Sequence, residues 1–179
     1  MNFTILASQE TVEKTIIALQ ANNISAEFVQ TGQEAKEKVL AMIPRGAEVM
    51  NMTSTTLDTI SLSQEILDSG KYDAVKKKLM TMDKKTQGRE MKRLGAAPEW
   101  AAGSVHAVTE DGKALIASNT GSQLSAYVYA ADHVIWVVGT QKIVKNVDTA
   151  IKRIYEYTLP LESERAHKAY GVPGSFVSK

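Results

Sequence analysis

Cysteine is absent from the 179 residues of this chain. Its absence excludes disulfide bonds, iron–sulfur ligation, thiolate zinc sites and cysteine nucleophiles. Histidine is scarce as well, and the three histidines (His106, His133 and His167) do not have the spacing of a metal site. We therefore expect no iron–sulfur cluster and no thiolate-bound metal on this chain, and the sequence specifies no other cofactor.

The chain also lacks a charge bias and a long apolar run, and we expect no leader segment. Its 21 Lys and Arg residues against 20 Asp and Glu residues give a net charge of +1 at pH 7, which supplies no argument for a nucleic-acid partner. The most apolar window, residues 124–139, is interrupted by Asp132 and His133 and is shorter than the ~20 residues of a membrane-spanning helix. The N-terminus has no basic region of the kind that opens a secretory signal. We expect a cytoplasmic protein without membrane association.

Hydrophobic residues make up 44% of the chain, which is enough for a core, and we expect residues 1–179 to form one domain. Apolar spacing predicts an alternation of helix and strand with short connections. Such an alternation is typical of a parallel sheet covered by helices. The predicted elements of the first part are a helix over 9–22, a strand over 24–29, a helix that Thr31 caps and Pro44 ends, and a strand over 47–52.

Residues 57–101 differ from the rest because their composition predicts helices and no strand. Within them, residues 71–93 contain nine Lys and Arg against three acidic residues, a net charge of +6, so the remainder of the chain carries −5. The neutral total therefore conceals a basic helical excursion.

The second half of the chain returns to strand patterns. Asp111-Gly112 between two apolar runs predicts a β-hairpin, and the apolar run over 133–138 predicts a strand buried on both faces. A helix is predicted from Asn146, with Pro160 breaking it. Its inward residues are expected to be Val147, Ile151, Ile154 and Tyr155, with Arg153 facing solvent.

Four segments in the last two-fifths of the chain carry a family resemblance: Glu110-Asp111-Gly112, residues 117–124, residues 138–144 and Pro160-Leu161-Glu162. They are similar to the LUD (lactate-utilisation) domain family. The resemblance implies a three-layer α/β/α fold with a mostly parallel central sheet, as in the NagB/RpiA/CoA-transferase group. It also implies a role in converting lactate to pyruvate beside separate iron–sulfur proteins. Similar proteins continue past residues 175–179 into another apolar strand, so either this sheet is one strand shorter or the sequence is truncated.

Polar turns follow three of the predicted strands at their carboxyl ends, where open parallel sheets bind ligands. Backbone N–H groups beside small or hydroxyl residues can hold a phosphate or carboxylate, and a lysine adds positive charge. The same residue types are also ordinary helix N-caps. The candidate ligand-binding residues are Thr53, Ser54, Thr55, Asn119, Thr120, Gly121, Ser122, Gln123, Gly139, Thr140 and Lys142.

Two further features have alternative interpretations. Glu110 is a candidate catalytic residue, because CoA-transferases of the similar fold form a thioester on a glutamate, but Glu-Asp-Gly-Lys is also ordinary turn chemistry. The basic segment 71–93 fits an acidic partner, a nucleic acid or a solvent-exposed helical face. Tyr72 is its only aromatic residue, which disfavours binding of single-stranded nucleic acid. His106 is expected to be structural.

The resemblance and the turns together predict a protein of lactate-type carboxylic-acid utilisation that binds a small anionic or nucleotide-like ligand. Because the chain has no cysteine, it cannot hold an iron–sulfur cluster, and oxidation of lactate would need a separate iron–sulfur or redox subunit or a redox cofactor. An assembly of several copies of the chain is compatible with the sequence. The alternatives are a CoA-transferase-like or sugar-phosphate enzyme using Glu110, and a protein- or nucleic-acid-binding module acting through residues 71–93.

Overall fold

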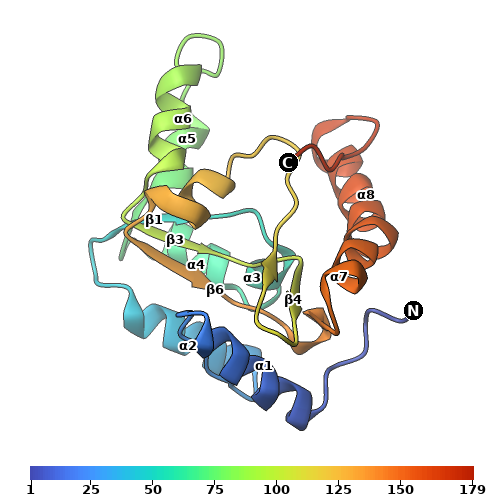
Figure 1. Cartoon of the computed structure of the whole chain (residues 1–179). Helices are drawn as coiled ribbons and strands as arrows, with labels where there is room; N and C mark the ends of the chain where they lie inside the picture. Colours follow the sequence, from blue (N-terminus) through green and yellow to red (C-terminus); the bar gives the residue numbers. More distant parts are fainter. The chain divides into compact units, whose positions relative to one another are not determined.

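The computed structural model describes all 179 residues, which divide into two compact units. Unit 1 comprises Met1–Phe28, Val105–Thr120 and Val138–Lys179, and unit 2 comprises Val29–Ser104 and Gly121–Val137. Figure 1 labels their helices and strands. None of the helices combines the length and the apolar composition needed to cross a membrane.

Unit 2 is built on a four-stranded parallel sheet. Its strand order is β2 (Asp73–Ala74), β1 (Glu48–Asn51), β3 (Trp100–Gly103) and β6 (His133–Trp136). Every neighbouring pair is parallel, so the carboxyl ends of these strands lie at one edge of the sheet. The predicted parallel sheet is therefore confirmed. The predicted burial of β6 on both faces is wrong, because β6 is the edge strand and its first two residues are exposed.

Five α-helices and one π-helical turn accompany this sheet: α2 (Gly32–Met42), α3 (Thr55–Thr59), α4 (Leu62–Asp68), α5 (Val75–Thr81), α6 (Gly88–Ala96) and η1 (Ala126–Ala130). The predicted excursion over 57–101 is mainly helical, as expected. Its lack of strands was a wrong prediction, because β2 and the start of β3 lie within it. A two-residue strand such as β2 is too short to produce an alternating pattern.

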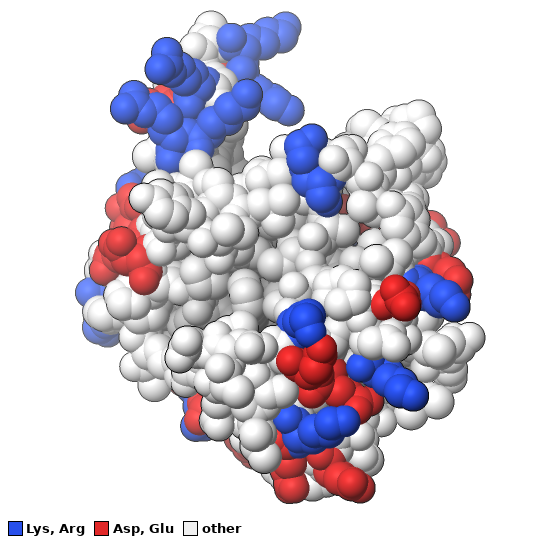
Figure 2. Space-filling model, viewed as in Figure 1, with Lys and Arg blue, Asp and Glu red and all other residues white.

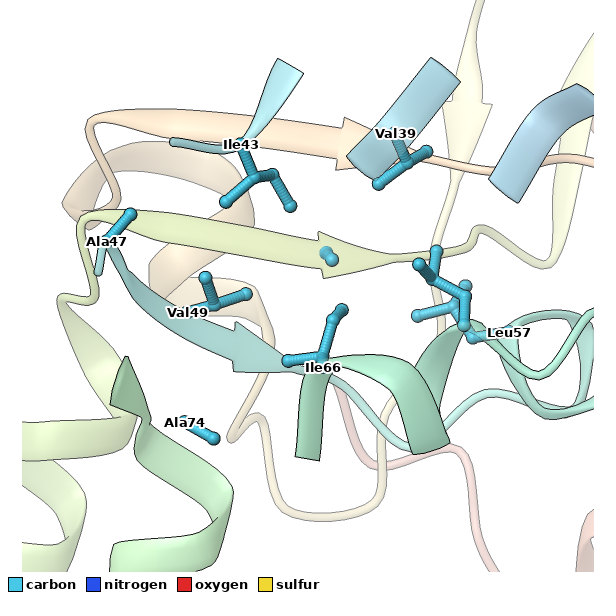
Figure 3. Packing of buried hydrophobic residues seen from close by; sticks show 9 residues of the cluster. Val39, Ile43, Ala47, Val49, Leu57, Ile66 and Ala74 are labelled. Carbon is cyan, nitrogen blue, oxygen red and sulfur yellow. The ribbon is translucent and has the colours of Figure 1, made fainter. Parts of the chain in front are cut away.

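The core of unit 2 forms where the helices meet one face of the sheet. Figure 3 shows Val39 and Ile43 of the α2 region, Leu57 and Ile66 of α3 and α4, and Val49 of β1, which belong to one buried cluster. Val49 and Leu57 are completely buried, and each such side chain contributes about 1.5–3 kcal/mol by leaving water.

Local capping starts two of these helices. The Thr31 hydroxyl accepts a hydrogen bond from the Glu34 backbone N–H (3.1 Å), as the sequence predicts, and α2 follows directly. The Glu34 carboxylate in turn accepts a hydrogen bond from the backbone N–H of Gln30 at 2.9 Å. Ser54 caps α3 by accepting from the Leu57 N–H. Each cap satisfies a backbone donor that the helix itself leaves unpaired and contributes about 1 kcal/mol.

Unit 1 contains a smaller, three-stranded sheet. Strand β4 (Ala107–Thr109) lies between β5 (Ala114–Leu115), with which it pairs antiparallel, and β7 (Ile143–Val144), with which it pairs parallel. The predicted hairpin is therefore confirmed. Its turn needs Gly112, which has a φ of +83°, and a Cβ there would collide with the backbone of Ala18.

The helices of unit 1 are α1 (Gln9–Ala21), α7 (Val147–Arg153) and α8 (Leu159–Tyr170), with the 3₁₀ turn η2 (Thr140–Lys142) and the π-helical turn η3 (Ile154–Thr158). Phe3, Ala107, Val144 and Ala150 form the core of this unit. The strand predicted over 24–29 does not form, because no neighbouring strand pairs with it.

Pro160 does not break the C-terminal helix as predicted. The helical conformation runs from α7 through η3 into α8, and Pro160 lies in the first turn of α8. Pro160 has no N–H to donate to the preceding turn. The wider turn at η3 re-sets the hydrogen-bond ladder immediately before it.

Candidate functional site

The predicted ligand-binding residues are divided between the two units. Unit 2 holds Thr53, Ser54, Thr55, Gly121, Ser122 and Gln123, and unit 1 holds Asn119, Thr120, Gly139, Thr140 and Lys142. Each unit therefore has to be judged by its own contacts.

The turn after β1 has the contacts of a helix cap. Ser54 accepts from the Leu57 N–H at 3.4 Å, and Thr53 accepts a hydrogen bond from the Lys76 ammonium at 3.5 Å. The helix that follows, α3, has only five residues. These contacts account for the polar side chains at 53 and 54 by local structure.

The turn over 119–123 crosses the boundary between the units after Thr120. Gly121 has a φ of +79°, a conformation that favours glycine. The carbonyl groups of Gly121 and Gln123 accept from the N–H groups of Leu124 and Tyr127, at 3.0 and 3.1 Å. This turn therefore leads the chain into η1.

The segment after residue 138 places a lysine inside unit 1. The Lys142 N–H donates to the Gly139 carbonyl at 2.9 Å, which closes the turn η2. The Lys142 ammonium then donates to the Val105 carbonyl at 3.0 Å. Both Gly139 and Thr140 are partly accessible beside it. The structure thus places Gly139, Thr140 and Lys142 in one short turn, and their ligand-binding role stays a prediction.

Two further cationic or titratable side chains lie close to Lys142, and we call His106, Lys142 and Arg153 the cationic cluster. Arg153 is only 3% exposed. Its guanidinium donates to the His106 carbonyl and to the Thr158 hydroxyl, and it lies over the Tyr157 ring at 5.1 Å from the centroid. No carboxylate lies within ion-pair distance of Arg153. Its positive charge is therefore held by neutral dipoles and an aromatic face alone.

Burial and mutual repulsion change the protonation of this cluster. Burial, and then the charges of Lys142 and Arg153, lower the pKa of His106 to about 4, against a small opposing effect of Glu162. Burial, followed by the charge of Arg153, lowers the pKa of Lys142 to about 8. Burial also lowers the pKa of Arg153, which stays protonated as an arginine. At neutral pH the cluster thus has two positive charges and a neutral imidazole.

One hydrogen bond fixes the tautomer of His106. Its Nδ1 atom accepts from the Ala117 backbone N–H at 3.2 Å. In the neutral ring the proton must then be on Nε2, so His106 presents an N–H donor at that atom. Together with Lys142, this ring can donate hydrogen bonds to an oxygen anion or a carbonyl oxygen.

The expectation that Arg153 faces solvent is wrong, because Arg153 is buried. Ala150, Arg153 and Ile154 are the buried residues of this helix region, and Ala150 belongs to the same buried cluster as Ala107 of β4. The sequence signal that could have shown this is the spacing of Ala150, Arg153 and Ile154, which places all three on one helical face.

Glu110 lies in the hairpin turn of unit 1. Its carboxylate pairs with the Lys14 ammonium at 2.8 Å, and its side chain is 27% exposed. The Glu110 N–H donates to the Val144 carbonyl at 2.9 Å. These contacts hold Glu110 by an ion pair in a turn, and its catalytic role stays a prediction. Nowhere in the chain do three His, Asp or Glu side chains gather in a group that could hold a metal ion.

Comparison with known proteins gives one match. The family model described as LUD domain matches residues 12–172, which span most of both units and include the whole cationic cluster. A search of the curated proteins finds no match.

Proposed function

The chain belongs to the LUD-domain family, and from this membership we propose that it takes part in lactate-type carboxylic-acid utilisation by binding a small anionic ligand at the cationic cluster. The ligand class is a carboxylate or phosphate small enough to reach Lys142 and the turn Gly139–Thr140.

The buried guanidinium of Arg153 is the observation that carries this proposal. A charge removed from water costs several kcal/mol unless an opposite charge or dipoles compensate it. Arg153 has neutral hydrogen-bond acceptors and no carboxylate partner, while the nearby carboxylate of Glu162 is engaged in a two-fold hydrogen bond with Arg165 at 2.7 and 2.6 Å. A bound anion would supply the missing negative charge.

The residues of the cluster have different parts in this proposal. Lys142, which is only partly buried, is the cation that contacts the ligand. The Nε2–H of His106 donates a hydrogen bond to a ligand oxygen. Arg153 holds the His106 backbone in position by its hydrogen bond to the carbonyl, and its positive charge attracts the anion. Oxidation of a bound lactate to pyruvate would release two electrons and two protons. This chain has no cysteine for an iron–sulfur cluster, so the electrons would pass to a redox cofactor or to a separate redox or iron–sulfur subunit, and the protons to solvent.

A thermal-shift panel of lactate, pyruvate, CoA, nucleotides, folates and sugar phosphates tests the proposal. A ligand present at 100 times its Kd should stabilise the protein by ~2.7 kcal/mol. Lys142→Met should remove this stabilisation. Lys145→Met is the matched control, because Lys145 is exposed and follows the same turn, and it should retain the effect. Equal responses of the two variants, or no response of the wild type to any anion, would contradict the proposal.

A further inference from the structure

A separate basic surface lies on unit 2. Helices α5 and α6 lie side by side and, with the connection over 82–87, form what we call the basic arm (Figure 1). Figure 2 shows Lys and Arg side chains gathered over this arm. Its ion pairs join Lys78 to Asp73 and Arg93 to Glu90. The exposed cations without any ion pair are Lys77, Lys84, Lys85, Arg89 and Lys92.

The base of the basic arm is hollowed. A cavity of about 320 Å³ opens there, beside the start of α5. Its apolar lining residues are Leu67, Tyr72 and Ala74, and Lys77, Lys78 and Thr81 line it with polar side chains. Gly70 and Asp73 complete the lining, and the Asp73 carboxylate is paired with Lys78. Leu67 and Tyr72 also pack against the core of unit 2.

The cavity and the charges together define the partner. We propose that the basic arm docks an acidic protein segment that inserts one bulky apolar side chain into this hollow. The unpaired lysines attract the acidic residues over a long range, and a partly desolvated Tyr72 is the kind of residue on which interface energy concentrates. This surface lies in unit 2 and is independent of the anion site proposed in unit 1.

A nucleic acid fits these observations less well. A phosphate backbone would engage the lysines, but it has no apolar side chain for the hollow, and Tyr72 is the only aromatic residue of segment 71–93. An anionic membrane would likewise contact the projecting end of the arm and leave the hollow at its base unfilled.

Fluorescence anisotropy on the full chain tests the proposal with defined probes. The first is a labelled peptide of Glu and Asp around a central Phe, the second has Ser in place of the Phe, and the third is a labelled RNA duplex. We expect the Phe peptide to bind about tenfold more tightly than the Ser peptide, because only the former fills the hollow. The RNA duplex should bind more weakly than the Phe peptide at physiological salt.

Two charge reversals separate docking from general attraction. Lys77→Glu, at a residue that lines the cavity, should weaken binding of the Phe peptide about tenfold, whereas Lys92→Glu, an identical charge change on α6, should weaken it by less than about threefold. Equal losses in both variants, equal affinity for the Phe and Ser peptides, or tighter binding of the RNA would overturn the proposal. Circular dichroism of both variants would show that each is folded.

Discussion

The two units treat positive charge in opposite ways. Unit 1 buries Arg153 and much of Lys142 beside His106, whereas unit 2 presents its cations on the exposed basic arm. Buried charges lose hydration and shift each other's pKa, as His106 and Lys142 show. Exposed charges are screened by salt and act mainly through long-range attraction. The difference favours a small anion as the ligand of unit 1 and a large acidic partner for unit 2.

The largest expected difference between the two regions is in the free energy of unfolding after one cation is removed from each. Arg153→Ala is expected to lower the free energy of unfolding by about 3 kcal/mol, because it opens a cavity and leaves the His106 carbonyl and Thr158 hydroxyl without their donor. Lys92→Ala should change it by less than about 0.5 kcal/mol. Urea denaturation measures both. Arg153→Met, which keeps most of the packing but not the charge, should lie between them, and similar losses for Arg153→Ala and Lys92→Ala would refute the contrast.

The free energy of unfolding should decrease at acid pH because His106 must be protonated. The folded-state pKa of about 4 lies below the model-peptide value of 6.5, so the unfolded chain binds a proton more readily. The stability that the neutral ring allows is complete above pH 6.5 and is lost as the pH falls toward 4, by about 3 kcal/mol. Comparing unfolding of the wild type with His106→Gln over this range isolates the contribution. If His106→Gln keeps the wild-type pH dependence, His106 is not its source.

Local patterns predicted much of the fold. The cap at Thr31, the hairpin at Gly112 and the alternation that gives the parallel sheet all depend on residues close in sequence, and the structure confirms them. The face of the C-terminal helix was not predictable in this way. Val147, Ile151 and Tyr155 were expected inside but are 38%, 44% and 52% exposed. The buried cluster of unit 1 contains the small Ala150 of this helix. The π-helical turn η3 also changes the direction in which residues 154–158 point relative to a regular α-helix.

The candidate site shows the same limit. Lys142 was recognisable, because it follows a glycine turn after an apolar strand. The hydrogen bond from the Arg153 guanidinium to the His106 carbonyl joins residues far apart in sequence. No local sequence pattern around either residue predicts this contact. Spacing also cannot distinguish a ligand-binding turn from a helix cap, and at Ser54 the cap is what the contacts show.

The affinity of unit 1 for an anion should decrease at alkaline pH. The ammonium of Lys142 is the proposed contact, and its pKa in the free protein is about 8. Above that pH the Kd for the anion should rise roughly tenfold per pH unit, because only the protonated lysine attracts it. Isothermal titration with lactate and pyruvate between pH 6 and 10 measures this. Lys145→Met should keep the break near pH 8, whereas Lys142→Met should bind weakly and without it. A break that persists in Lys142→Met would assign the titration to another group.

The basic arm should show the smallest effect, and one that salt removes. Arg89 and Lys92 are like charges three residues apart on α6 and neither has an ion-pair partner. Lys92→Glu turns this repulsion into attraction and should raise the free energy of unfolding by about 0.2–0.5 kcal/mol at low salt. At about 1 M salt the Debye length falls to ~3 Å and the gain should vanish. The cost of Arg153→Ala should persist at that salt, because its packing and hydrogen bonds lie in the interior. If the loss of unfolding free energy caused by Arg153→Ala also decreases at high salt, the charge of Arg153 is screened by solvent as the charges of the basic arm are.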